Sequence, residues 1–205
     1  MRGRMHLRQQ QKKSAHLTFP FSKSPFSIQG AVLGASFYLY FIVPTFAGRL
    51  TDALGAKWIT FSGLLVPCLL TALLPVVIRS VGVGAAIAIQ TINGGFHGCL
   101  YPSLFSLYTS WFPAKERSTA NALIIFGGSL GNAAMYILGG YLCATDIGWP
   151  LVFYSLSALH LPWLAAWLWY ASSQPADNRR ISDEELLYLK QNVAVKKSSS
   201  SVSKV

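Results

Sequence analysis

Five long stretches without a charged residue constrain this chain more than any other feature. They cover residues 24–48, 58–78, 80–114, 118–145 and 147–176. An α-helix needs about 20 apolar residues to cross the hydrocarbon of a bilayer, so each stretch is long enough for one membrane-spanning helix. The stretches are rich in Gly, Ala and Ser and show little of the polar striping of a water-soluble bundle. We therefore predict five transmembrane helices, at 29–47, 58–78, 83–108, 118–142 and 149–171.

The composition fits burial in a lipid bilayer. Charged residues make up 12% of the chain and hydrophobic residues 52%, whereas a soluble domain carries about 25% charged residues. The net charge of +10 arises mainly from the two ends, because residues 24–173 are nearly neutral. A basic surface for nucleic acid is therefore excluded. The sequence predicts an all-α, polytopic membrane protein whose bundle occupies residues 28–173.

The two ends differ from the bundle. Residues 1–27 form a basic segment, predicted to be disordered, with the composition either of a mitochondrial transit peptide or of a solvated tail. Within residues 174–193, Ser182 and Glu185 have the spacing of a capping box, which predicts an amphipathic helix over about 183–192. Residues 194–205 are a low-complexity Ser/Lys tail, also predicted to be disordered.

The sequence carries no arrangement of residues typical of an enzyme or a metal site. Cys68, Cys99 and Cys143 lie within or at the edge of predicted helices and lack metal-ligand spacing. A Ser-His-Asp set, a zinc motif and a phosphate-binding loop are all missing from the sequence. We predict a non-enzymatic protein with no cofactor and no metal.

The first loop between predicted spans, residues 48–57, has a pattern that local chemistry can explain. Gly48 is expected to end a helix where it closely approaches a neighbour. Asp52 is expected at a helix terminus, where a carboxylate meets a positive dipole end or a basic partner. Gly55 permits a tight reversal, and Lys57 begins the next helix.

This loop resembles the loop between helices 2 and 3 of major facilitator superfamily transporters, whose pattern is Gly-x-Leu-Ala-Asp-Arg-x-Gly-Arg-Lys. The pattern fits at Gly48, Leu50, Asp52, Gly55 and Lys57. It departs at Thr51, Ala53 and Ala56, and two of these positions lose an Arg. The resemblance implies that residues 48–57 act as a cytosolic gating loop.

Three further motifs are similar to one branch of that superfamily, the anion:cation symporters, which include vesicular glutamate transporters, sialin and type-I sodium/phosphate cotransporters. Tyr101-Pro102 is followed by a Trp-Phe-Pro-Ala-Lys-Glu-Arg-Ser stretch that holds Glu116 and Arg117. The other two are Gly-Trp-Pro-Leu-Val-Phe-Tyr at 148–154 and Ile-Ser-Asp-Glu-Glu at 181–185. The resemblance implies that Glu116 and Arg117 belong to a second cytosolic loop.

In that register the five predicted helices correspond to family helices 2–6, so the chain is expected to be a fragment. A complete member has two six-helix halves that rock about a central site. The family topology places the C-terminus in the cytosol and leaves the plasma, lysosomal or vesicle membrane undecided. The basic N-terminal residues then lie on the opposite side, against the positive-inside rule. We therefore expect residues 1–27 to replace, or to derive from a misjoined piece of, helix 1 and its following loop.

Polar residues in the third predicted helix mark a candidate substrate and ion pathway. Gln90, Asn93, His97 and Tyr101 recur at spacings of three or four and share one helix face. Polar side chains within a membrane normally face the protein interior or a water-filled cavity.

The family resemblance makes two of these positions informative. It implies an Arg at the position of Gln90, a Glu at that of His97 and a His at that of Phe105, so this sequence departs from the familiar anion site. We hypothesise that His97 is the proton-sensitive group. The alternative is a structural histidine bonded between helices, and His160 is a weaker candidate.

Two functions follow. The first is a proton- or sodium-coupled secondary transporter of small organic anions or phosphate, with the missing half of the transporter as a further partner. The alternative is a truncated, non-transporting membrane protein that interacts with other membrane helices through its Gly-rich faces.

Overall fold

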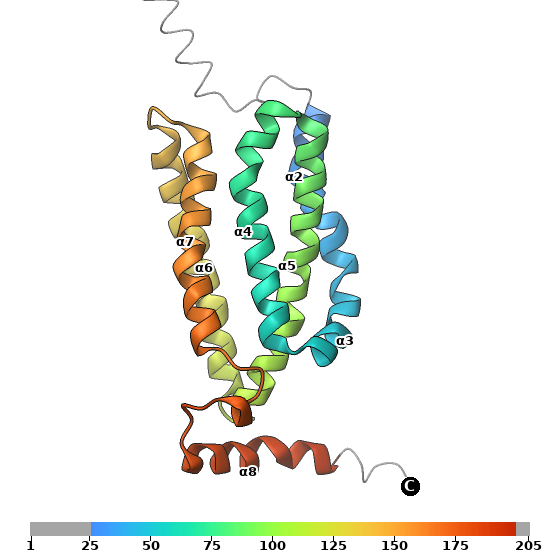
Figure 1. Ribbon diagram of the computed structural model, residues 1–205, viewed down its shortest axis with the longest axis vertical. Helices are drawn as coiled ribbons and strands as arrows, with labels where there is room; N and C mark the ends of the chain where they lie inside the picture. The colour runs from blue at the N-terminus through green and yellow to red at the C-terminus, as the bar shows by residue number, and fades with distance from the viewer. Residues whose placement is uncertain (1–25, 200–205) are drawn as a thin grey trace, which may run out of the picture.

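A computed structural model describes residues 26–199, and all of the regular secondary structure in that range is helical (Figure 1). The elements are α2 Phe26–Ile42, α3 Pro44–Leu54, α4 Ala56–Ser80, α5 Val83–Trp111, α6 Arg117–Cys143, α7 Trp149–Tyr170, the 3-10 helix η1 Pro175–Asp177 and α8 Asp183–Ser199. The predicted all-α fold class is confirmed. The predictions for residues 1–25 and 200–205 lie outside the described residues. Helix α2 nevertheless begins within the segment 1–27 that was predicted to be disordered, because Phe26 and Ile28 already belong to its apolar sequence.

The first predicted helix, 29–47, is in fact two helices. Helices α2 and α3 meet at Val43–Pro44 and are bent by 58°. Pro44 has no N–H to donate, and its ring would clash with the carbonyl of Tyr40 in a straight helix. The chain therefore restarts at Pro44, with Phe46 N and Ala47 N both donating to Val43 O. The prediction of one continuous helix was wrong because it treated Pro44 as tolerated inside the span.

Helix α5 is the centre of the bundle. It packs against α2 and α3 on one side and against α4 on another. Glycines make these approaches possible: a methyl group on Gly94 would collide with the carbonyl of Ser36, and one on Gly63 would lie 3.1 Å from Phe96 O. Small residues at helix crossings let backbones come together where lipid supplies no hydrophobic drive for association.

Hydrogen bonds link α4 to its two neighbours. Thr60 Oγ1 donates to Ser103 Oγ of α5 over 2.9 Å. On α7, Ser157 Oγ donates to Cys68 O over 3.1 Å, and Cys68 Sγ donates back to Ser157 O over 3.4 Å. These groups are buried, so the bonds hold three helices at fixed relative heights.

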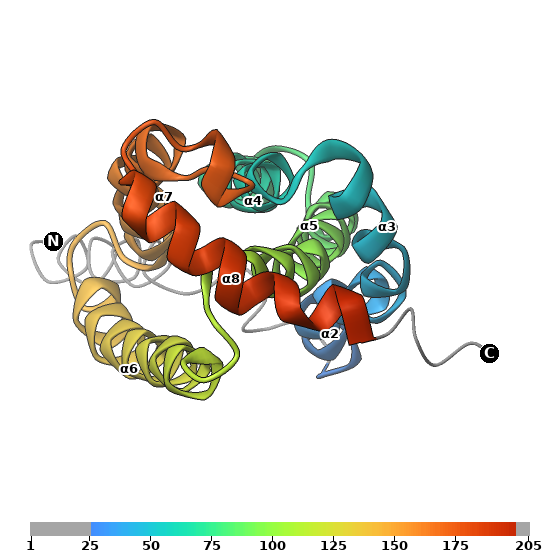
Figure 2. The same cartoon turned by 90° about the horizontal axis from the view of Figure 1, so that it is seen from below.

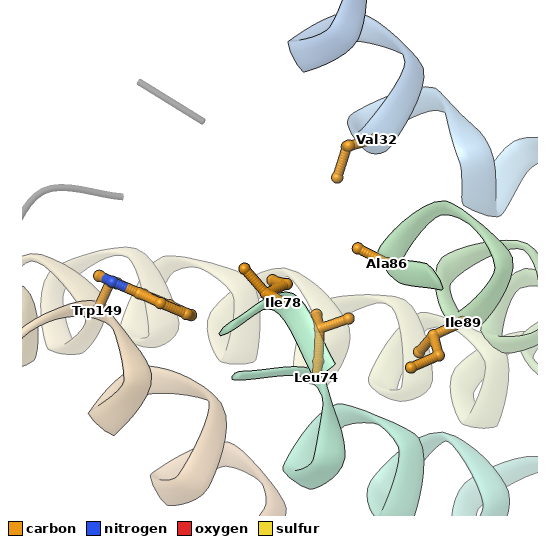
Figure 3. Close-up of a cluster of buried hydrophobic side chains, with 6 residues drawn as sticks. All are labelled: Val32, Leu74, Ile78, Ala86, Ile89 and Trp149. Atoms are coloured by element: carbon orange, nitrogen blue, oxygen red, sulfur yellow. The ribbon is translucent and has the colours of Figure 1, made fainter. Parts of the chain in front are cut away.

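An apolar cluster closes the end of the bundle opposite α8 (Figure 3). Its buried members come from four helices and are Val32, Leu74, Ile78, Ala86, Ile89 and Trp149. The guanidinium of Arg79 lies 5.6 Å from the centre of the Trp149 ring. A cation–π contact of this kind lets the charge lie beside the apolar cluster at the end of α4.

Helix α6 is the least tightly packed of the long helices. It packs mainly on α7 and only slightly on α5, and Ala120 is its buried residue. Figure 2 shows α6 set apart from the group formed by α2, α4, α5 and α7. Added methyl groups on Gly127, Gly128, Gly131 and Gly140 would meet nothing within 4 Å. Within residues 26–199, these glycines have no helix against them.

The helices meet the requirements of membrane spans unequally. Helices α4, α6 and α7 are long and apolar enough to cross a bilayer, and the bent pair α2–α3 makes a fourth if it is one span. These three or four candidate spans, counted by length and composition over the described residues, are consistent with the predicted polytopic helical bundle. Helix α5 has the length, at 29 residues, but polar residues such as Gln90 and Asn93 reduce its apolar character. Because α2, α3 and α4 cover much of it, α5 does not need a fully apolar surface.

Helix α8 lies across the lower end of the bundle in Figure 1, transverse to the long helices, and Figure 2 shows it from below. We call this end the α8 end. The predicted cap is present, since Glu185 N donates to Ser182 Oγ over 3.2 Å. Leu189 is buried, and α8 contacts α5. The helix continues to Ser199, so the prediction of disorder from residue 194 is wrong as far as 199. Ala and Lys are strong helix formers, and elongation needs no new nucleus.

Candidate functional site

The predicted pathway residues lie on a side of α5 that its two main neighbours leave open. Helix α2 approaches α5 at Gly94 and Gly98, and α4 approaches it at Phe96 and Leu100. Successive residues of an α-helix are rotated by 100° about its axis. Gln90, His97 and Tyr101 therefore lie on a side of α5 that faces neither α2 nor α4, and Asn93 lies between that side and the side facing α4. We call these four residues the α5 polar stripe. Asn93 is buried, Gln90 is half-buried, and His97 and Tyr101 are exposed.

Asn93 is the constrained member of the α5 polar stripe. Its Nδ2 donates to Gln90 Oε1 over 3.2 Å. Its Oδ1 is buried and has no hydrogen-bond partner among the described residues. A buried acceptor without a partner costs about 1–3 kcal/mol. Asn93 Oδ1 is therefore a position where a water molecule or a polar ligand group gains a hydrogen bond.

A second histidine, His160 of α7, lies at the depth of the α5 polar stripe. The Cys68–Ser157 bonds and the approach of α5 to Gly63 set the relative heights of the three helices. An α-helix rises 1.5 Å per residue, so these contacts place His97 and His160 within about 2 Å of each other along the long axis of the bundle. The sequence ranked His160 as the weaker candidate because helical spacing relates residues of one helix only.

The tautomer of His160 follows from its hydrogen bond. Its Nδ1 lies 2.8 Å from the carbonyl of Leu156, four residues earlier on α7. A carbonyl oxygen only accepts, so Nδ1 carries the proton. The neutral ring then leaves Nε2 with a lone pair, able to accept a hydrogen bond or a proton.

The predicted gating loop is mostly helix. Gly48 and Asp52 lie within α3, and the reversal to α4 occupies Gly55 alone, whose φ is 86°. Gly48 is exposed and has no neighbour within 4 Å of an added methyl group, so it does not end a helix at a close approach. Asp52 lies in the last turn of α3, at the negative end of that helix. Asp52 makes no salt bridge with any other residue in 26–199. Of the two partners expected for its carboxylate, the positive end of a helix dipole and a basic side chain, neither is found there.

Lys57 fastens the start of α4 to the end of α7. Its Nζ donates to Leu168 O over 3.1 Å, and its backbone N donates to Ser173 Oγ over 3.2 Å. In return, Trp167 Nε1 donates to Lys57 O over 3.2 Å. A cation on the last carbonyls of a helix satisfies groups that have no partner within the helix. The roles of Trp167 and Ser173 were missed, because both lie more than 100 residues from Lys57 in the chain.

Arg117 has a matching role at the end of α5. Its Nη2 donates to Thr109 O over 2.8 Å and its Nε to Phe112 O over 3.0 Å. Tyr108 Oη donates to the carbonyl of Arg117 over 2.9 Å. Glu116 is exposed at the start of α6 and makes no side-chain cap bond. The cations at 57 and 117 therefore cap the two helices that end beside α8.

Within residues 26–199, no three His, Cys, Asp or Glu side chains lie close enough together to hold a metal ion. Cys68, Cys99 and Cys143 are free thiols.

Comparison with known proteins decides the family. The family model described as Major Facilitator Superfamily matches residues 15–202. The chain belongs to this superfamily. Its transmembrane helices and transporter relatives agree with that membership.

Three relatives fix the branch more closely. Human sialin is 30% identical over 161 residues, which cover 78% of this chain and 32% of sialin. The mouse probable small intestine urate exporter is 30% identical and covers 79% of this chain and 32% of that protein. The Arabidopsis thaliana chloroplastic sodium-dependent phosphate transport protein 1 is 28% identical, with 82% and 32% covered. The similarity to the anion:cation symporter branch is confirmed, and the chain spans about a third of the length of these relatives.

Proposed function

We propose that this chain is part of a secondary transporter that moves small organic anions or phosphate across a membrane, coupled to protons or sodium. The observation that carries the proposal is the α5 polar stripe, which lies on the side of α5 that α2 and α4 leave open. The names of two relatives, a probable urate exporter and a sodium-dependent phosphate transport protein, support the substrate class.

Within this proposal, the α5 polar stripe lines the pathway. Asn93 Oδ1, buried and unpaired within the described residues, accepts a hydrogen bond from the substrate or from a water molecule beside it. Gln90 holds the Asn93 amide in place. His97 binds the coupling proton, because an imidazole changes charge near neutral pH. The α5 polar stripe contains no Lys or Arg. The anion is therefore bound by uncharged hydrogen-bond donors of the stripe, and protonation of His97 adds a positive charge.

The proposed orientation places the α8 end of the bundle in the cytosol. The α3–α4 turn, the α5–α6 loop and α8 all lie at that end (Figure 1). Lys57, Lys115 and Arg117 are there too, in agreement with the excess of cations on cytosolic loops. The Gly48–Lys57 and Glu116–Arg117 segments then face the cytosol, as loops that gate movement between halves.

A second candidate function is supported by α6. Its described surface is almost wholly exposed, and four of its glycines face open space. A helix face of this kind suits close packing against another membrane helix. We therefore keep the alternative of a non-transporting protein that binds other membrane proteins.

Two measurements separate these functions. An antibody against residues 183–193 measures the size of the native protein in membranes, and proteoliposomes measure urate and phosphate uptake under proton and sodium gradients. A native band well above 22.4 kDa, with uptake by that longer product, supports the transporter. A native band at that mass without uptake above empty vesicles supports the interaction partner and contradicts transport.

A further inference from the structure

A groove separates α8 from the end of the bundle. It has a volume of about 540 Å³ and is bounded by the last turn of α5, the start of α6, η1 and α8. One part of its wall is polar and holds Arg117, Gln174 and Lys190. Helix α8 supplies Lys190 and also the apolar part of the wall, which consists of Leu186, Leu189 and Val193. The lining of the groove therefore combines a positively charged part with an apolar part.

The charge of the groove has one sign. Arg117 and Lys190 line it, and no Asp or Glu does so among the described residues. The acids of α8 are confined to its first turn, at 183–185, before the lining residues begin. An anion in the groove thus meets two cations and no nearby carboxylate in the lining.

The two cations differ in mobility and complement each other. The Nε and Nη2 of Arg117 are held by the carbonyls of Phe112 and Thr109, which fixes the plane of the guanidinium. A guanidinium has five N–H groups, so donors remain for an anion. Lys190 is exposed and has no salt bridge within residues 26–199. Guanidinium groups bind phosphate through paired N–H donors, and lysine ammonium groups bind it as compact charges.

Exposed aromatic side chains lie at the same end of the bundle as the groove. Trp111 Nε1 donates to Ser172 O beside the groove. Trp169 and Tyr170, at the end of α7, are 74% and 63% exposed. Arg180 lies 4.6 Å from the Tyr170 ring centre and 5.7 Å from that of Trp169. Trp and Tyr gather at the membrane–water interface, so a belt of exposed rings marks the headgroup region.

We propose that this groove binds the phosphate group of an anionic phospholipid, with Arg117 and Lys190 on the phosphate and the acyl chain against Leu186, Leu189 and Val193. Basic pockets at this level are suited to phospholipid head groups. A free phosphate would engage the same cations, but it would make no use of the apolar wall. The inference does not depend on the transport function proposed above.

The test uses the purified full chain in detergent, and native mass spectrometry counts the lipids it retains. The probes are phosphatidylglycerol and phosphatidylcholine of equal acyl length, each with and without inorganic phosphate. We expect the chain to retain phosphatidylglycerol and to release phosphatidylcholine. Lys190→Glu should reduce the retained phosphatidylglycerol roughly fivefold or more, the effect of one cation near an anionic lipid. Gln174→Glu, at an exposed position, should act in the same direction.

The matched control is Arg179→Glu, which makes the same charge change at an exposed position outside the lining of the groove. It should retain phosphatidylglycerol as the unmodified chain does. Equal retention by the unmodified chain, K190E and Q174E would overturn the proposal, as would equal retention of the two lipids. Displacement of the lipid by inorganic phosphate at equal concentration would also overturn it, in favour of a soluble anion.

Discussion

Thr60 and Ser103 meet hydroxyl to hydroxyl at the crossing of α4 and α5, where Thr60 is 1% and Ser103 0% exposed. Ser103 Oγ accepts this hydrogen bond and in turn donates one to Leu100 O on its own helix. Two helices that lack an ion pair at this crossing are therefore held by neutral side chains completely shielded from lipid.

Thr60→Val should destabilise the bundle by about 1 kcal/mol, because a hydrogen bond between membrane helices contributes on that order. Valine keeps the branched shape of threonine, so the change tests the hydroxyl rather than the packing. Thermal unfolding of the purified chain in detergent measures the effect. Ser129→Ala is the control, since Ser129 is exposed on α6 and its hydroxyl donates only to its own helix at Ile125 O. Equal losses in the two variants would contradict this role for Thr60.

Gly94→Ala should be far more damaging than its size suggests. The added methyl group would collide with the backbone carbonyl of Ser36, which cannot rotate away as a side chain can. We expect a loss of about 1–3 kcal/mol, the range for overpacked interiors, together with displacement of α2. Size-exclusion chromatography and thermal unfolding in detergent measure both effects.

Gly127→Ala provides the matched comparison, because a methyl group at Gly127 meets nothing within 4 Å. Alanine is favoured over glycine in a helix by roughly 0.5–1 kcal/mol, so this variant should be neutral or more stable. A loss at Gly127 as large as that at Gly94 would show that the crossing with α2 is not the cause.

Lys57→Met should loosen the end of α7. The variant keeps an unbranched side chain one atom shorter than lysine and removes the ammonium that donates to Leu168 O. Hydrogen exchange of the amides at 168–173 should become faster, since local opening reports the loss of local contacts. Lys115→Met, an exposed change in the α5–α6 loop, is the control and should leave those amides unaltered. Unchanged exchange in Lys57→Met would remove the capping role from Lys57.

His97→Gln tests the proton site in the longer product that shows uptake. If His97 binds the coupling proton, the variant should lose the pH dependence of uptake while the protein still folds and inserts. His160→Gln is the comparison, since His160 lies at the same depth on the neighbouring helix α7, and it should leave the pH dependence of uptake in place. A pH profile that neither substitution changes would leave His97 with a structural role.

The sequence predicted most helix positions because charge and length decide them. Residues 56–80, 83–111, 117–143 and 149–170 are helical, and the predicted ends differ by at most three residues. The Ser182 cap was also predictable, because a capping box is a local pattern. The break at Pro44 was not recognised, since proline is often tolerated in membrane helices and the outcome depends on what packs beside it.

The candidate site was harder to predict than the helices. Helical spacing relates Gln90, Asn93, His97 and Tyr101 to one another on α5, and their role as a pathway stays a prediction. Spacing gives no information about α7, because the depth of His160 depends on how α4 fixes the relative heights of α5 and α7. Asp52 illustrates the opposite problem: its motif matched, yet the helix extends through it and leaves its carboxylate exposed.

The loose attachment of α6 has a consequence for how the chain assembles. Helices α2, α4, α5 and α7 hold one another through glycine crossings and shared hydrogen bonds, whereas α6 contributes little buried surface within residues 26–199. The other four should therefore associate as a unit whether or not α6 has docked. During membrane insertion α6 should join last, and it is the helix that a translocon or chaperone would retain longest.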